Sequence, residues 1–319
     1  MSADAGDELL VEVIPPALAG ERLDRIVSLV TGASRADAAV LVNTGGASVD
    51  GEVVTSGKIR LTEGQQVVLD PTYLPQVQVP QPDPTVEVRV VYADADVIVI
   101  DKQAGLVVHP GAGHADGTLV NGLLALYPEI ADVGQAGRPG IVHRLDVGTS
   151  GLLVVARTQV AYDVLVAALA ARDVGRRYRT LVWGHPANPV GVIDAPIGRD
   201  HRDPMKMAVV VDGKAARTHY RVLHTYRDIA DVAELECRLE TGRTHQIRVH
   251  LAAIGHPVVG DGTYGGSRPG ITPPRPVLHA AVLSFAHPVT RRTLTFESPL
   301  PDDLAAVLSS VGEPVVNDA

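Results

Sequence analysis

Cysteine and aromatic side chains are scarce in this chain. Cys237 is the only cysteine, so an intrachain disulfide is impossible and a cysteine-rich metal site is excluded. A lone thiol fits a reducing compartment, and we expect a cytoplasmic protein. Aromatic residues make up only 3% of the 319 residues while hydrophobic residues make up 45%, so alanine and valine must supply much of the core.

Long apolar runs and positive charge are also in short supply. No stretch approaches 18 consecutive apolar residues, so no membrane span or membrane partner is expected. The opening residues, MSADAGDELL, lack the basic start and apolar centre of a secretory signal. The net charge of −9 argues by itself against a nucleic-acid partner, because phosphate binding needs positive charge. A basic groove on an acidic body would satisfy that need locally.

The first part of the chain has the punctuation of a small compact unit. Residues 1–15 are expected to form a flexible acidic tail. Helical spacing follows over 21–30 and over 35–43, where Ser34 can cap the second helix. Asp50-Gly51 between two short β runs predicts a hairpin. The unit should therefore span residues 16–70.

Five prolines without helical periodicity lie within residues 71–84, which predicts an extended linker. Strand-like runs dominate residues 85–312 and are joined mostly by short turns, whereas helical text is confined to about 117–128, 159–173 and 244–255. This pattern predicts an α+β fold with a largely antiparallel mixed β-sheet and flanking helices. Residues 313–319 read as a second tail.

Two patterns with a possible chemical meaning have plainer explanations. GDGTYG at 260–265 matches a nucleotide-binding fingerprint, but a proline-rich stretch follows it instead of a helix, so we predict a turn. The chain has twelve histidines, and a metal-dependent hydrolase is one alternative function. His245 and His250 are five residues apart, which suits one helical face poorly, and we predict no metal site.

Three polar residues stand inside the apolar segment GIVHRLDVGTSGLLVVART, residues 140–158. Asp146 precedes a small, polar turn that can fix a carboxylate at a sheet edge. Its simplest partner is Arg144, as a buried ion pair. Arg243, in a turn before the helix that carries Arg248, is a second candidate that would keep Asp146 anionic for nucleophilic attack. For His143 we predict a structural hydrogen bond.

The segment RRYRTLVWG at 176–184 predicts a strand in which Tyr178 faces away from Arg177 and Arg179. A lone tyrosine in a strand is usually part of the core. An aromatic ring between two arginines can instead stack a base while phosphates are held.

Taken together, these segments resemble known motifs. HRLDVGTSGLLVVART, RRYRTLVWG and ETGRTHQIRVHLAAIGHPVVGDGTYGG occur in the order and spacing of RluA/RluD-type RNA pseudouridine synthases. VIVIDKQAGLVVHPGAG (97–113) resembles the first motif of that family, and LHAAVLSFAHPVT (278–290) the last. The N-terminal unit is similar to a small αL RNA-binding fold named after a ribosomal protein.

The resemblance implies isomerisation of uridine to pseudouridine in RNA, without a cofactor. It makes Asp146 the essential carboxylate, oriented by Arg243, and lets Tyr178 stack on the uracil. By the same resemblance, Arg144 is expected to fill the space that the flipped nucleotide leaves. Further RNA contacts are expected from Arg177, Arg179 and Arg248, and from Arg35 and Lys58 in the N-terminal unit.

The expected partner is large-subunit ribosomal RNA, free or in an assembling subunit, and transfer RNA is the alternative. A non-catalytic RNA-binding module is a further alternative. No protein partner is implied, and we expect a monomer. Basic residues concentrated in the middle of the catalytic domain should line an RNA groove while acidic residues face elsewhere: Arg172, Arg176, Arg177, Arg179, Arg199, Arg202, Lys206, Lys214 and Arg217.

Overall fold

The computed structural model describes residues 9–75, 79–111 and 113–315, and contacts divide the chain into two compact units with the boundary after residue 77. That boundary falls inside the proline-rich segment 71–84. Each unit has a hydrophobic core of its own.

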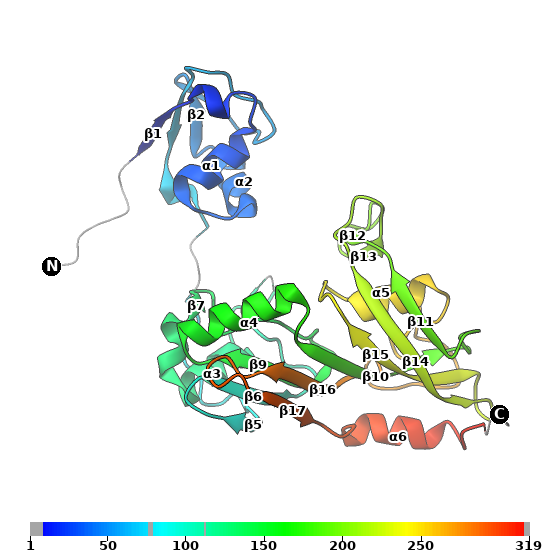
Figure 1. Ribbon diagram of the computed structural model, residues 1–319. Coiled ribbons are helices and arrows are strands. Elements are labelled where there is room, and N and C mark those ends of the chain that lie inside the picture. The colour runs from blue at the N-terminus through cyan, green and yellow to red at the C-terminus, as the bar shows by residue number, and fades with distance from the viewer. Residues whose placement is uncertain (1–8, 76–78, 112, 316–319) are drawn as a thin grey trace. The chain divides into compact units, whose positions relative to one another are not determined.

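The first unit packs two helices against a small antiparallel sheet (Figure 1). Ser34 caps the second helix, because its hydroxyl accepts the N–H of Asp37 at 3.2 Å. Asp50 and Gly51 have φ angles of 51° and 86°, as a two-residue hairpin turn requires, which confirms the predicted hairpin. The sheet order is β1-β4-β2-β3, and the elements are β1 (Leu10–Val13), η1 (Pro16–Leu18), α1 (Leu23–Thr31), α2 (Arg35–Asn43), β2 (Ala47–Val49), β3 (Glu52–Val53), β4 (Gln66–Leu69) and η2 (Pro71–Tyr73).

The prediction of a flexible tail over residues 1–15 is wrong for the residues that the structure describes. β1 pairs with β4, and Ile14 is only 1% exposed. β1 escaped notice because three of its four side chains are exposed on an edge strand, which leaves little hydrophobic pattern to detect. Residues 1–8 lie outside the described part of the chain.

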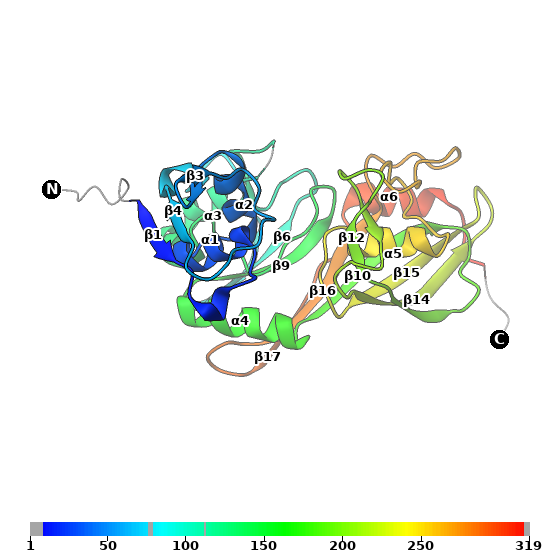
Figure 2. The ribbon, with the colours of Figure 1, turned by 90° about the horizontal axis from the view of Figure 1, so that it is seen from above.

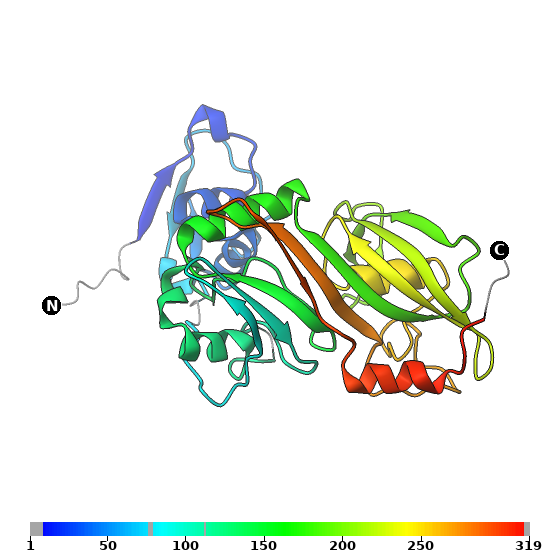
Figure 3. The same cartoon turned by 60° about the horizontal axis from the view of Figure 1, so that its bottom comes forward.

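A long mixed sheet is the centre of the second unit (Figures 1 and 3). Its order is β11-β14-β15-β10-β16-β9-β6-β5, with β17 paired to β16. The β9–β16 pair is parallel and the other neighbours are antiparallel, which confirms the predicted sheet type. The strands are β5 (Val90–Ala93), β6 (Val97–Lys102), β9 (Ser150–Ala156), β10 (Gly175–Trp183), β11 (Val190–Asp194), β14 (Arg217–Tyr226), β15 (Val232–Leu239), β16 (Leu278–Ala286) and β17 (Thr293–Glu297).

Helices cover both faces of this sheet. Alternate residues of β6 and β9 point to opposite sides, so that one set packs with α3 (Leu119–Leu126) and the other with α4 (Gln159–Ala171). α5 (Gln246–Ala253) shares the core of α3, and Figure 2 shows α4 and α5 over opposite ends of the sheet. These three helices were predicted, and the structure confirms them.

The remaining helix, α6 (Asp302–Ser310), was not predicted. It packs against Leu181 and Trp183 on the outer face of β10. The N–H of Val315 donates to the carbonyl of Thr225 at 2.7 Å, so the described end of the predicted second tail is fixed to β14.

Short elements complete the second unit. They are η3 (Pro128–Asp132), the pair β7 (Gly134–Gln135) and β8 (Arg138–Pro139), and the pair β12 (Ile197–Arg199) and β13 (Met207–Val209). The β12–β13 hairpin projects from the end of the sheet near β11 and β14 (Figure 1). Among the described residues, no single helix has the length and hydropathy to cross a membrane; α1 and α2 pass that test only as a pair bent by 113°.

Candidate active site

Asp146 lies in a turn that is held by a hydrogen bond within the turn and by two other segments of the chain. The N–H of Thr149 donates to the carbonyl of Asp146 at 3.0 Å, and the N–H of Gly105 donates to the next carbonyl, that of Val147, at 2.7 Å. Nη1 of Arg275 donates to the carbonyl of Gly148 at 3.1 Å. β9, whose seven residues are all buried, begins immediately afterwards. The backbone around the carboxylate is therefore tied to the core on both sides.

The ion pair that holds Asp146 involves Arg248 and not Arg243. Nη1 of Arg248 lies 3.1 Å from Oδ2 of Asp146, whereas Nε of Arg243 donates to the carbonyl of Ala215 at 3.1 Å. The predicted pairing of Asp146 with Arg243 is therefore wrong. Arg243 still lines the same cavity, from the turn before α5.

Arg248 is itself fixed by a second carboxylate. Its Nε and Nη2 bind the two oxygens of Asp261 at 2.6 and 3.0 Å, and its guanidinium lies 5.0 Å from the centre of the Tyr264 ring. Burial lowers the pKa of Arg248, but the hydrogen bonds and charges of Asp261 and Asp146 more than reverse this and raise it above its ordinary value. Asp146 thus faces a permanent, rigidly oriented cation.

Tyr178 occupies the inner face of β10 and lines the cavity beside Asp146. It is 5% exposed, and burial raises the pKa of its hydroxyl to about 12, although the charge of Arg176 lowers the pKa and that of Asp146 raises it slightly. The hydroxyl is therefore protonated at neutral pH.

Arg177 and Arg179 point to the other face of β10, as the alternation predicts, and they do not line the cavity. Arg177 lies 3.7 Å from a carboxylate oxygen of Glu236, and Arg179 forms a close ion pair with Glu234. The two arginines consequently do not flank a base placed against Tyr178.

The cavity has a volume of about 360 Å³, which lies at the lower end of the range for small-ligand sites. Asp146 is the one carboxylate among its lining residues. The cavity is lined by five arginines: Arg138, Arg144, Arg176, Arg243 and Arg248. In the described part of the chain, only Arg248 has a carboxylate within ion-pair distance. The cavity therefore holds an excess of uncompensated positive charge.

The neighbours of Asp146 have separate roles. Nε2 of His143 accepts the N–H of Val154 at 3.1 Å, which confirms the predicted structural hydrogen bond. Burial lowers the pKa of His143 to about 3, so the ring is neutral. Arg144 is exposed, and no acceptor among the described residues bonds its guanidinium. The alternative of an ion pair between Arg144 and Asp146 is excluded.

The predicted separation of basic from acidic residues in the catalytic domain is wrong. Arg172 and Arg217 both approach Glu240, and Arg217 also pairs with Asp194. Together with the pairs of Arg177 and Arg179, these contacts make a mixed-charge network on the outer face of β10, β14 and β15. The ion pairs depend on which strands become neighbours and in which register they pair, and the sequence alone does not determine either.

In the first unit, Arg35 opens α2 and Lys58 follows the β2–β3 hairpin. Both side chains are exposed. They are available for contact with a partner of that unit.

Two residues of the site were missed from the sequence. Lys102 is 2% exposed, and its ammonium donates to the carbonyls of Gln103, Leu106 and Val147 at 2.7, 2.8 and 3.4 Å. Burial lowers its pKa to about 7, although the charge of Asp146 raises it. A lysine at the end of the apolar run 97–100 was the available signal. Asp261 was hidden in GDGTYG, which forms the predicted turn.

The two histidines considered as metal ligands bond to the protein instead. Nδ1 of His245 lies 2.8 Å from the hydroxyl of Tyr264. His250 is fully buried, with Nδ1 2.9 Å from the hydroxyl of Thr218 and Nε2 2.9 Å from the carbonyl of Ala195. These contacts occupy both ring nitrogens of His250.

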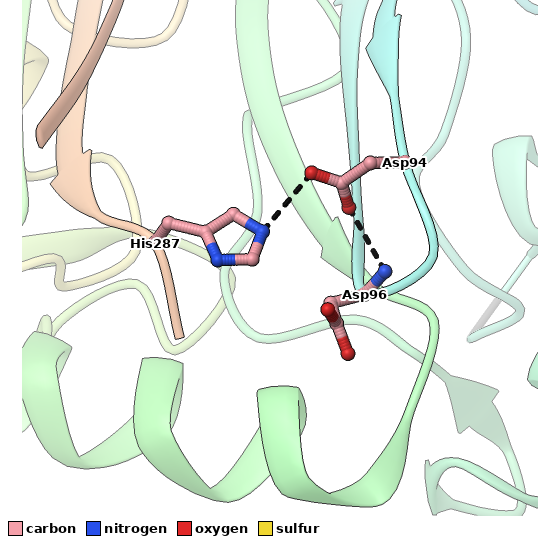
Figure 4. A group of neighbouring side chains, drawn as sticks. All are labelled: Asp94, Asp96 and His287. Carbon is pink, nitrogen blue, oxygen red and sulfur yellow. Dashed lines mark hydrogen bonds and ion pairs between the residues drawn. The ribbon is translucent and has the colours of Figure 1, made fainter. Parts of the chain in front are cut away.

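One cluster of potential metal ligands lies elsewhere, between the β5–β6 and β16–β17 turns (Figure 4). Nδ1 of His287 accepts two backbone N–H groups, so Nε2 carries the proton and donates to Asp94 at 3.0 Å. Partial burial raises the pKa of Asp94, but hydrogen bonds from the Tyr92 hydroxyl, the backbone N–H of Asp96 and its neighbour, and His287 lower it to about 2. This tautomer leaves no lone pair on Nε2 for a metal, and the cluster ties two turns together.

Comparisons with known proteins agree with one another. A family model described as RNA pseudouridylate synthase matches residues 96–253. YlyB of Bacillus subtilis, which is named as an uncharacterized RNA pseudouridine synthase, is 46% identical over 241 residues, which cover 74% of this chain and 78% of that protein.

A longer match is the ribosomal large subunit pseudouridine synthase D of Pseudomonas aeruginosa, 46% identical over 309 residues and 93% of each chain. Among solved structures, human RNA pseudouridylate synthase domain containing 1 has a TM-score of 0.57 and 29% identity, covering 71% of this chain and 90% of that one.

Proposed function

The chain belongs to the RNA pseudouridine synthase family, and we propose that it converts specific uridines of large-subunit ribosomal RNA to pseudouridine at Asp146. The observation that carries this proposal is the single carboxylate, clamped by Arg248, in a cavity with uncompensated arginines. Such a cavity requires an anionic ligand, and RNA supplies one phosphate per nucleotide. Relatives named as ribosomal large subunit pseudouridine synthases support ribosomal RNA as the substrate.

The isomerisation breaks the N-glycosidic bond, turns the uracil and joins it to the ribose through carbon. No atom is gained or lost and nothing is oxidised, so the chain's own residues suffice. Arg248 binds Oδ2 of Asp146, and no donor in the described part of the chain bonds Oδ1. Oδ1 is therefore the oxygen we assign to the substrate, as nucleophile or as base.

We propose that the ring of Tyr178 stacks on one face of the uracil. Its ring lies in the wall of the cavity, and stacking a base on an aromatic side chain contributes about 1–3 kcal/mol. Removing a base from its stack costs a few kcal/mol. Arg144, exposed at the cavity, can offset part of that cost by occupying the place that the nucleotide leaves.

The first unit, from β1 to η2, is proposed to be an αL-type RNA-binding domain, and a linker in the later part of residues 71–84 is proposed to join it to the catalytic domain, which is the second unit. Its two helices, its hairpin and the exposed Arg35 and Lys58 support this role. We propose that the protein acts as a monomer in the cytoplasm.

The test is to map pseudouridine in total RNA from cells that lack the gene and carry wild type, Asp146→Asn or Asp163→Asn. Asp163 is an exposed aspartate on α4, away from the cavity, and provides the matched control. Sites in large-subunit ribosomal RNA should return with wild type and Asp163→Asn but not with Asp146→Asn. Sites confined to transfer RNA would move the substrate assignment, and substantial product from Asp146→Asn would overturn the role of Asp146.

A further inference from the structure

Arg176 is a buried cation without a counter-ion. It is 7% exposed, and no described carboxylate lies within ion-pair distance of its guanidinium. Its Nη2 is 3.5 Å from the backbone carbonyl of Glu240, and its Nε has no hydrogen-bond partner. Burial lowers its pKa, which reflects the cost of keeping this charge away from water. Buried charges in proteins are normally paired, so we expect the counter-ion of Arg176 to be supplied by a bound ligand.

Carboxylates nearby are already used. The side chain of Glu240 binds Arg172 at 2.8 Å and also contacts His219 and Arg217. On the same strand, Arg177 and Arg179 each have a glutamate on the outer face of the sheet. The chain therefore neutralises the arginines that face outward and leaves the one that faces the cavity without a partner.

Arg176 points into the cavity next to a helix N-terminus. It lies on the same face of β10 as Tyr178, two residues or about 7 Å along the strand. Opposite it is Gly242, where a Cβ would lie 2.8 Å from Nη1 of Arg176. The turn 242–245 then leads into α5 and lines the same cavity. The first N–H groups of a helix lack intrahelical acceptors and carry partial positive charge, so they attract anions. Here the N–H of Gln246 donates to the carbonyl of Arg243 and the N–H of Arg243 donates to Oε1 of Gln246, both at 3.0 Å, while the N–H groups of Thr244 and His245 donate to no acceptor in the described part of the chain.

We propose that Arg176 and the turn 242–245 at the start of α5 form a binding site for one backbone phosphate of the RNA, beside the nucleotide that Tyr178 and Asp146 engage. The guanidinium supplies two or more donors in one plane, which is the geometry that phosphate oxygens accept. Gly242 keeps the space above the guanidinium open. This inference rests on the proposed function for the identity of the phosphate as part of RNA.

The test uses a ribosomal RNA fragment that contains a mapped uridine, with single methylphosphonate groups replacing the phosphates around it one at a time. For wild type, the Kd should rise about tenfold or more when the phosphate at one position is replaced, as expected for the loss of a charge-assisted hydrogen bond. Arg176→Gln should bind the natural and the neutral RNA equally at that position. Arg221→Gln, which removes an ion-paired arginine on the outer face, should respond as wild type does. Equal responses of wild type and Arg176→Gln at every position would overturn the proposal.

A second measurement separates a phosphate site from a structural arginine. Without RNA, Arg176→Gln should melt at the temperature of wild type or above it, because the replacement removes an unpaired buried charge. Inorganic phosphate should raise the melting temperature of wild type and Arg221→Gln but not that of Arg176→Gln. A lower melting temperature of Arg176→Gln, or an equal response of all three proteins to phosphate, would contradict the inference. If ribosomal RNA proves not to be modified while inorganic phosphate still separates the variants, the proposed function fails and the phosphate site stands.

Discussion

Replacing Arg248 with methionine should destabilise the catalytic unit far more than removal of an ordinary surface ion pair. The side chains of Arg248 and Asp261 are 10% and 1% exposed, and two hydrogen bonds join them. Removing one partner of a buried pair leaves the other charge uncompensated and costs about 3–5 kcal/mol. In the described part of the chain, Asp261 then retains only the backbone N–H groups of Thr263 and Tyr264 as donors.

The measurement is urea unfolding followed by tryptophan fluorescence. Trp183 is the only tryptophan, and its indole N–H donates to the carbonyl of Gly266 at 2.7 Å, so the signal reports on this unit and on the loop that carries Asp261. Arg89→Met is the matched control, because Arg89 and Glu87 form an exposed pair with 60% and 66% of their side chains accessible. That control should lose no more than about 1 kcal/mol.

Charge and packing can be separated in the same experiment. Adding Asp261→Asn to Arg248→Met removes the stranded charge and should restore part of the free energy of unfolding, while pseudouridine formation stays absent because Asp146 has lost its clamp. A loss in Arg248→Met no larger than in Arg89→Met would refute the reasoning. So would a double variant less stable than the single one, since the stranded carboxylate would then not be the cause.

Three further predictions follow from burial and exposure in the same unit. Lys102 has a pKa of about 7 when folded and about 10.5 when unfolded, so the unfolded state binds more protons between these two pH values. The free energy of unfolding should therefore rise with pH from 7 to 10 in wild type but not in Lys102→Met. Urea unfolding that gives the two proteins the same dependence on pH would contradict this. Arg144→Ala should change the free energy of unfolding by less than about 0.5 kcal/mol yet slow single-turnover pseudouridine formation, and an unchanged rate would remove Arg144 from the site. Because the Tyr178 hydroxyl has a pKa of about 12, wild type and Tyr178→Phe should share one pH dependence of rate between pH 7 and 10, and a basic limb in wild type alone would show that Tyr178 ionises.

The elements around the site were predictable wherever local pattern and burial coincide. β9 is a continuous apolar run that is buried on both faces, and α4 has helical periodicity with a threonine cap. Alternation along β10 placed Tyr178 opposite Arg177 and Arg179 before any contact was known. The same alternation also shows why those two arginines do not flank a base that is placed against Tyr178.

The ion pair of Asp146 could not be predicted because it depends on a third segment. Arg243 and Arg248 both precede or open α5, and spacing alone does not choose between them. Asp261 decides the matter: it binds two nitrogens of Arg248 and leaves Nη1 directed at Asp146. Asp261 comes from a turn whose chemical role is invisible in its glycine-rich sequence. β1 escaped for the opposite reason, since an exposed edge strand has almost no pattern to detect.

The net charge of −9 proves to be the wrong quantity for judging whether this chain can bind RNA. What attracts a phosphate is positive charge that the protein has not already neutralised. Within four residues, β10 carries both arginines that are neutralised by glutamates and an arginine that is not. Arg177 and Arg179 face glutamates across the sheet and contribute little net field. Arg176, on the face of β10 that lines the cavity, has no carboxylate within ion-pair distance among the described residues, and its Nε has no hydrogen-bond partner. A chain can therefore be acidic overall and still offer a cavity whose unmet charge only an anion can satisfy.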